Sequence, residues 1–159
     1  MTLEVRSSAF DPNGEIPELH TCEGRDASPA LEWSGAPPAT RSFALIVDDP
    51  DAPDPRRPTH TFVHWVLYDI PAATTGIDEG AAAPSGAREG VNGSNDVGYT
   101  GPCPPRGRHR YVFKLYALDV LLGDLGRPKK ADVEAAMRGH VLASAEVIGT
   151  YERARAERR

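Results

Sequence analysis

The sequence lacks the long apolar segments that enter or cross membranes. Nowhere in its 159 residues does a run of about 18 apolar residues occur. The N-terminus, MTLEVRSSAFDPNG, has no basic stretch that leads into an apolar run. We therefore expect neither a membrane-spanning nor a secreted product, and we expect a cytoplasmic location.

Cysteine is also scarce, because Cys22 and Cys103 are the only two. Two cysteines are too few for a disulfide framework, and they lack the C-x-x-C spacing of a zinc or thioredoxin-like site. We expect reduced thiols. A single bridge between them stays open, since the sequence does not show whether they meet.

An excess of positive charge is missing as well. The 18 Lys and Arg residues against 23 Asp and Glu give a formal net charge of -5, which repels the phosphate backbone of nucleic acids. The only basic cluster is the arginines of segment 153–159, diluted by Glu152 and Glu157. We expect no nucleic-acid partner.

Glycine and proline are abundant, with 15 of each, and indicate many turns and loops. The small-residue stretch Gly80–Gly86 is typical of an exposed loop. A chain of this length has the usual size of one folding unit, so we expect a single domain over residues 1–159.

Strand patterns outweigh helix patterns. β-branched and aromatic residues bounded by Pro, Gly or Asp predict strands over Leu3–Val5, Ser42–Val47, Thr61–Asp69 and Arg110–Leu118. Residues 61–68 are apolar on both faces, as in a buried central strand. Apolar spacing predicts one short helix over Lys130–Leu142, although Gly139 weakens its last turn. Alternation then predicts a strand over Leu142–Tyr151, with residues 152–159 frayed.

Several ionisable side chains continue the apolar faces of these strands. Side chains two apart on a strand share a face. By this count, the residues that continue an apolar face are Asp49, His64, His109 and Tyr111. The same count places Phe62 and Val66 on the face of His64. Ionisable groups in such positions need a partner or a neighbouring pocket.

The proline-rich loop Gly98–Gly107 is the second unusual feature. Its prolines remove most backbone donors and leave the N–H groups of Gly101 and Cys103 as isolated candidates to cradle an anion. A plain rigid connector is the alternative. By itself, Asp48–Pro53 is typical of a rigid turn.

Two other kinds of site fit less well. His60 and His64 lie about 13 Å apart on a strand, too far to share one metal ion, even with Asp49, Asp51 or His109 nearby. Cys103, His109 and Asp49 form a conceivable nucleophilic triad, but nothing lowers the pKa of a thiol between two prolines. The sequence has no GxSxG elbow, Walker loop, GxGxxG turn or HExxH motif. We expect no metal, no cofactor and no enzymatic turnover.

Three motifs in order resemble the phosphatidylethanolamine-binding protein family, also called the Raf kinase inhibitor protein family. They are Asp48–Pro53, His64–Tyr68, and Gly98–Gly107 followed by His109-Arg110-Tyr111. Further similar segments are Ile16–Pro29, Leu31–Gly35 and Gly149–Tyr151. The resemblance covers nearly the whole chain and is closer to the shorter bacterial and archaeal (YbhB/YbcL-like) branch.

This resemblance implies a mainly β fold, with a large antiparallel Greek-key sheet, a smaller sheet and one or two short helices. It also implies a shallow pocket for phosphate-like groups, such as a phospholipid head group or a phosphorylated ligand. Carried over to this sequence, the ligand-binding residues are Asp49, His64, Gly101, Pro102, Cys103, His109 and Tyr111. We expect Asp49 to orient one imidazole, and a protonated histidine to bind the anion.

The resemblance implies a regulatory, non-catalytic binding protein. The alternative is an inhibitor that inserts its pocket rim into a protein kinase or serine protease. A homodimer is a further implied assembly. The sequence departs from eukaryotic members in its short link from Pro105 to His109 and in ending at Arg159 without their extra C-terminal helix.

Overall fold

The computed structural model describes residues 2–153. Its elements, in chain order, are β1 (Glu4–Arg6), a 3-10 helix (Glu18–His20), β2 (Leu31–Ser34), β3 (Ser42–Ala52), β4 (His60–Pro71), β5 (Gly76–Ile77), β6 (Arg88–Glu89), β7 (His109–Leu118), α1 (Lys130–Met137) and β8 (Val141–Tyr151). Most of the regular structure is therefore strand.

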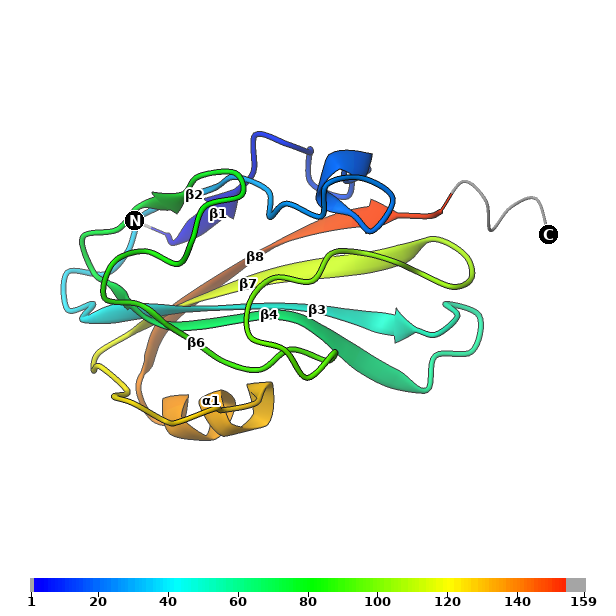
Figure 1. The fold of residues 1–159 in the computed structure, drawn as a ribbon. Helices are drawn as coiled ribbons and strands as arrows, with labels where there is room; N and C mark the ends of the chain where they lie inside the picture. The colour runs from blue at the N-terminus through cyan, green and yellow to red at the C-terminus, as the bar shows by residue number, and fades with distance from the viewer. Residues whose placement is uncertain (1, 154–159) are drawn as a thin grey trace.

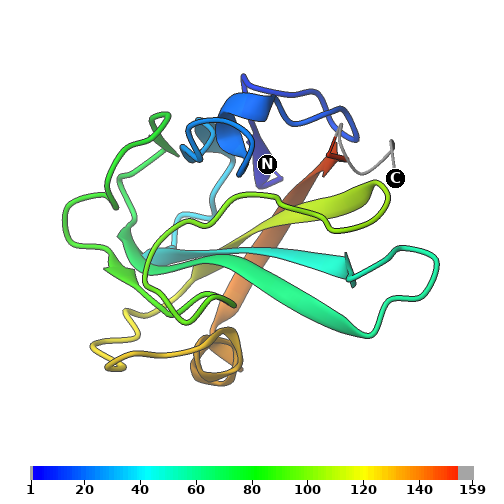
Figure 2. The same ribbon diagram turned by 45° about the vertical axis from the view of Figure 1, so that its right-hand side comes forward.

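The strands form two antiparallel sheets. A five-stranded sheet has the order β6-β4-β3-β7-β8, and a three-stranded sheet has the order β1-β2-β5. Within the larger sheet β7 returns to lie beside β3, which gives the order of a Greek key. The small sheet and the 3-10 helix lie over one face of the large sheet, and α1 lies under the other (Figures 1 and 2). The predicted mainly β fold is confirmed.

Each face of the large sheet has its own apolar cluster. Between the sheets, Trp33 of β2 packs with buried residues such as Phe43, Trp65 and Phe113. On the other face a smaller cluster joins the sheet to Val133 and Met137 of α1. This double coverage explains why β3 and β4 are apolar on both sides.

The element boundaries differ from the sequence predictions in places. β3 continues to Ala52, so most of Asp48–Pro53 is strand rather than turn. The helix ends at Met137, before Gly139, whose φ of 80° is left-handed. Gly80–Gly86 is a largely exposed loop, as predicted. Of the segment expected to fray, residues 154–159 lie outside the described residues.

A β-bulge in β4 determines where His64 points. Val47 of β3 pairs with Trp65, and the next residue, Asp48, pairs with Val63, so His64 is the extra residue. Trp65 belongs to the cluster between the sheets, whereas Val66 belongs to the cluster under α1. The prediction that His64 and Val66 share a face is therefore wrong, because the bulge reverses the alternation.

Cys22 and Cys103 form a disulfide across 81 residues of sequence. The expectation of reduced thiols is wrong for this structure, because the fold brings the loop after the 3-10 helix against the proline-rich loop. The bridge also removes one argument for a cytoplasmic location, since disulfides are rare in that compartment. In residues 2–153, no helix is long and apolar enough to cross a membrane.

We predict that the double variant Cys22→Ser/Cys103→Ser is less stable than the oxidised wild type by about 4 kcal/mol, because the bridge restricts a long loop in the unfolded chain. Urea unfolding at pH 7 measures this. A dithiol reductant should lower the stability of the wild type to that of the variant and leave the variant unchanged. Equal stabilities without reductant would contradict the prediction.

Candidate functional site

A cavity of about 280 Å³ opens where β3 ends and where β4 and β7 begin. Every predicted site residue except Pro102 lines it. The full lining is Asp49, Ala52, Pro53, His60, Phe62, His64, Ser94, Thr100, Gly101, Cys103, Pro104, Pro105, His109 and Tyr111. Sequence analysis missed the apolar part of this wall, because alanine, phenylalanine and proline carry no chemical signature of a site.

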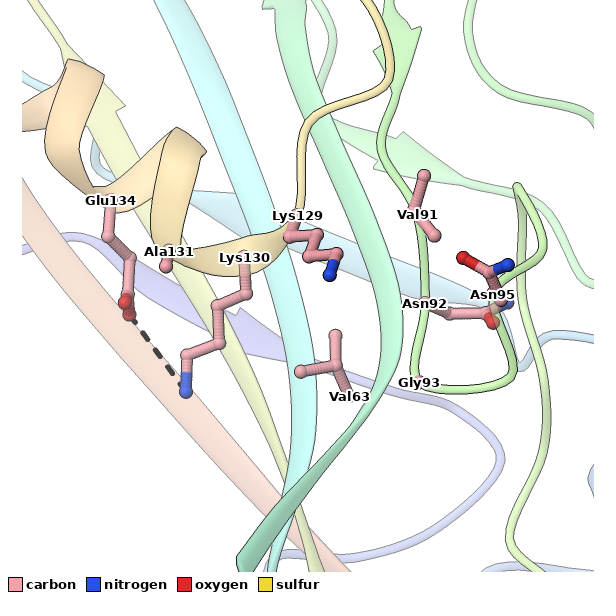
Figure 3. A pocket seen from close by; sticks show the side chains of 9 residues that line it. All are labelled: Val63, Val91, Asn92, Gly93, Asn95, Lys129, Lys130, Ala131 and Glu134. Atoms are coloured by element: carbon pink, nitrogen blue, oxygen red, sulfur yellow. Dashed lines mark ion pairs between the residues drawn. The ribbon is translucent and has the colours of Figure 1, made fainter.

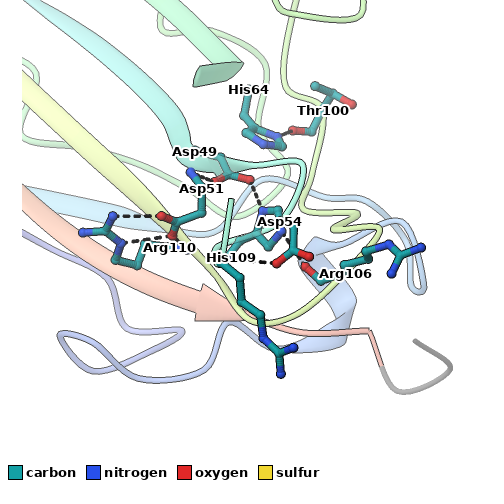
Figure 4. A network of polar contacts seen from close by, with 9 residues as sticks. Asp49, Asp51, Asp54, His64, Thr100, Arg106, His109 and Arg110 are labelled. Atoms are coloured by element: carbon teal, nitrogen blue, oxygen red, sulfur yellow. Dashed lines mark hydrogen bonds and ion pairs between the residues drawn. The ribbon is translucent and has the colours of Figure 1, made fainter. Parts of the chain in front are cut away.

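A buried ion pair between Asp49 and His109 forms one wall of the cavity (Figure 4). His109 Nδ1 lies 2.6 Å from Asp49 Oδ2, and Nε2 lies 2.8 Å from the carbonyl oxygen of Arg106. Both partners accept hydrogen bonds, so both ring nitrogens donate and the ring is an imidazolium. Asp49 thus orients an imidazole, as expected.

Burial works against the charge on His109, but the hydrogen bond and charge of Asp49 outweigh it and raise the pKa of the imidazole. The other carboxylate oxygen of Asp49 accepts the backbone N–H of Asp51 at 2.7 Å. Both N–H groups of His109 are thus used within the protein. His109 contributes positive charge to the cavity but has no free donor for a ligand.

A second ion pair, between Asp51 and Arg110, lies next to the Asp49–His109 pair (Figure 4). Asp51 accepts hydrogen bonds from the backbone N–H and the guanidinium of Arg110, at 2.8 to 3.0 Å. The side-chain hydrogen bond from Arg110 holds the pKa of Asp51 below its usual value. Each of these two carboxylates therefore has its own cationic partner.

His64 presents an acceptor to the cavity. Its Nδ1 lies 2.6 Å from the carbonyl oxygen of Thr100, so Nδ1 carries the proton. Burial lowers the pKa of the ring, which favours the neutral form with a lone pair on Nε2. The expectation that a protonated histidine donates to the anion stays untested, but both N–H groups of His109 are already used, and the surroundings of His64 favour its neutral form.

The hydroxyl of Tyr111 has no hydrogen-bond partner among residues 2–153, although the side chain is only 1% exposed. Its ring contacts the His64 ring edge-on, with 5.2 Å between centroids. An unpaired buried hydroxyl costs about 1–3 kcal/mol. Because the Tyr111 side chain lines the cavity, its unpaired hydroxyl is a candidate donor to a ligand atom.

The proline-rich loop is tied to the segment around Asp26. Gly101 N–H donates to Asp26 Oδ1 at 2.8 Å, and Cys22 N–H donates to the carbonyl of Pro102 at 3.1 Å. A Cβ at Gly101 would clash with the backbone carbonyl of His20 as well as with that Asp26 oxygen, so only glycine fits. The expectation of a free Gly101 donor is wrong, and Pro102, whose carbonyl accepts from Cys22, does not line the cavity. No sequence pattern signalled Asp26.

The conceivable nucleophilic triad is not assembled. Cys103 Sγ is bonded to Cys22, and both nitrogens of His109 are engaged elsewhere. Within the described range 2–153, no group of three or more His, Cys, Asp or Glu side chains is placed to hold a metal ion.

A larger cavity of about 470 Å³ lies on the opposite face of the large sheet, beside α1 (Figure 3). Lys130 lines it, but its Nζ lies 2.6 Å from the buried Asp48 and 4.0 Å from Glu134. Its cation is therefore already paired. This cavity contains none of the predicted site residues, so the smaller cavity is the candidate site.

The Asp49–His109 pair predicts a pH-dependent stability. Because folding raises the pKa of His109, its contribution is complete below the unfolded value of about 6.5 and is lost as pH rises through the folded value. Urea unfolding of His109→Gln at pH 6 should show a loss of about 3 kcal/mol, since Asp49 loses its buried partner. The loss should be smaller at pH 9. An equal or larger loss at pH 9 would contradict this assignment.

The sequence of this chain is similar to one family of known proteins. The family model described as phosphatidylethanolamine-binding protein matches residues 6–152. A UPF0098 protein of Methanothermobacter thermautotrophicus is 44% identical over 95% of this chain and 99% of its own length.

Solved structures agree. A phosphatidylethanolamine-binding protein homologue of Chlamydia trachomatis, CT736, is 39% identical, with a TM-score of 0.89 over 96% of this chain and 98% of its own. E. coli YbcL is 32% identical, with a TM-score of 0.82 over 96% and 99%. A carboxypeptidase Y inhibitor complexed with its cognate proteinase, at 21% identity and a TM-score of 0.56 over 95% and 82%, shares the fold alone. The chain belongs to the phosphatidylethanolamine-binding protein family, in its bacterial and archaeal branch.

Proposed function

We propose that this chain is a non-catalytic, regulatory binding protein whose cavity takes a small ligand with a phosphate group. The observation that carries this proposal is the buried, unpartnered hydroxyl of Tyr111, a residue that lines the cavity. A ligand oxygen there would accept the hydroxyl proton and offset the cost of burying it. The Cys103 N–H, in the same wall, would be a second donor.

The charges of the cavity wall restrict the ligand further. Within the lining, Asp49 is matched by His109, and outside it the neighbouring Asp51 is matched by Arg110. Burial lowers the pKa of His64, which favours its neutral form. The wall has no surplus cation from these groups, and a fully anionic ligand would face the carboxylate of Asp49. A zwitterion such as phosphoethanolamine suits this arrangement, because its amine offsets its own phosphate charge.

Inhibition of a protein kinase or serine protease through the pocket rim stays the alternative function, and no specific contact of this chain favours it over ligand binding. The homodimer and the cytoplasmic location implied at the outset also stay predictions. A cofactor has no role in the proposed binding.

The first test is the conservative variant Tyr111→Phe. It removes a hydroxyl that makes no internal hydrogen bond, so the fold should keep its stability or gain some. Calorimetric titration with phosphoethanolamine at pH 6 should give an affinity about tenfold lower than that of the wild type, the usual effect of one lost hydrogen bond.

Tyr116→Phe is the matched control. Tyr116 lies on the same strand but packs with the cluster under α1, away from the cavity. Its variant should bind like the wild type. If wild-type protein binds no phosphate compound, or if Tyr111→Phe binds as tightly as the wild type, the proposed ligand site is wrong and a protein partner becomes the better candidate.

A further inference from the structure

We infer that the cavity selects an oxyanion that brings its own proton, so that a singly protonated phosphate group donates its P–O–H to His64 Nε2. This inference rests on the proposed function and deepens it, because it assigns the protonation state of the ligand. It predicts discrimination between phosphate and sulfate monoesters, which have the same shape but differ in this proton.

The first step is the tautomer of His64. A carbonyl oxygen can only accept, so the 2.6 Å contact between Nδ1 and the Thr100 carbonyl places a proton on Nδ1. The Thr100 N–H in turn donates to the His64 carbonyl at 2.9 Å, which fixes the strand and the loop together. Nε2 is then the ring nitrogen left for the cavity, and in the neutral ring it accepts.

The second step is the set of charges around His64. Asp49 on β3 lines the same cavity and favours a charged His64 ring, but its oxygens already accept from His109 and from the backbone of Asp51. The imidazolium of His109 on β7 opposes a second positive charge beside it. Asp48 acts from the opposite face, where Lys114 and Lys130 neutralise it at 3.1 and 2.6 Å.

The remaining neighbours of His64 do not supply a proton to Nε2. Phe62 packs edge-on against the His64 ring, with 4.9 Å between centroids, and Tyr111 contacts it from β7. His64 is only 4% exposed, so bulk water does little to stabilise a charged ring. The ring is thus held neutral by geometry and surroundings together.

The third step is what an oxyanion meets in this cavity. The Tyr111 hydroxyl donates to one ligand oxygen, whereas His64 Nε2 presents a lone pair to another. The dianion of a phosphate monoester has no P–O–H, so it would set an oxygen lone pair against the lone pair of Nε2 and would also face Asp49. A P–O–H group converts the repulsive contact into a hydrogen bond and lowers the ligand charge by one.

The test compares methyl phosphate and methyl sulfate by calorimetric titration of the wild type between pH 5.5 and 8.5 at constant ionic strength. Both are largely monoanions at pH 5.5, and only methyl phosphate carries a proton on an oxygen. The methyl phosphate dianion has no P–O–H, so its affinity should fall about tenfold per pH unit above its second pKa, near 6. Methyl sulfate should bind at least tenfold more weakly than methyl phosphate at pH 5.5. Methyl sulfate that binds as tightly as methyl phosphate would overturn the inference, because the proton would then reside on His64. A methyl phosphate affinity that does not change with pH would also overturn it.

A variant tests the role of His64 directly. His64→Gln places an amide with an N–H donor at this position, so the requirement for a ligand proton should disappear. The pH slope should flatten, and the gap between methyl phosphate and methyl sulfate should shrink below threefold. His140→Gln changes a histidine that pairs with Asp119 outside the cavity lining, and it should leave both unchanged. A His64→Gln variant with wild-type slope and selectivity would overturn the inference.

The two proposals fail in different ways. If neither methyl phosphate nor phosphoethanolamine binds the wild type at any pH, the proposed function fails and this inference fails with it. If methyl phosphate binds and methyl sulfate binds equally well, only the inference fails. The decisive comparison uses wild-type protein, so it does not depend on whether the variant folds.

Discussion

The hydrogen bond between the Asp49 carboxylate and the His109 imidazolium holds the open end of the large sheet together. It joins β3 to β7 beyond the apolar core, and the second ring nitrogen of His109 draws in the carbonyl of Arg106. The cavity wall therefore rests on charge and hydrogen bonding rather than on packing alone. A buried imidazolium keeps its charge here because each of its two protons has an acceptor.

Asp48 and Asp49 are adjacent on β3, and their side chains point to opposite faces of the large sheet. Asp48 follows the strand alternation to the opposite side, where it is buried and binds Lys114 of β7 and Lys130 of α1. Asp49 turns toward the cavity. The two adjacent aspartates thus anchor the helix on one face and the candidate site on the other, so β3 couples the two layers of the molecule.

Much of the fold followed from sequence pattern, because long strands with apolar faces leave a clear signal. The phase of β3 and β7 placed Asp49, His109 and Tyr111 on one face correctly, since neither strand is interrupted between these residues and the core. The short strands β2, β5 and β6 were missed because only a few residues define each one. The roles of the polar groups were harder to predict, since they depend on contacts between distant segments. Asp26 at Gly101 and Cys22 at Cys103 are examples.

The bulge at His64 divides β4 into one part that packs in the core and one part that lines the cavity. On the Trp65 side, side chains must fit a closed core, where a change of one methylene is felt. On the His60 side, side chains meet a cavity open to solvent and are free of that restriction. Substitutions at positions 60 and 62 can therefore change what the cavity accepts at little cost to the core, whereas substitutions in the Trp65 half of the same strand change the stability of the fold.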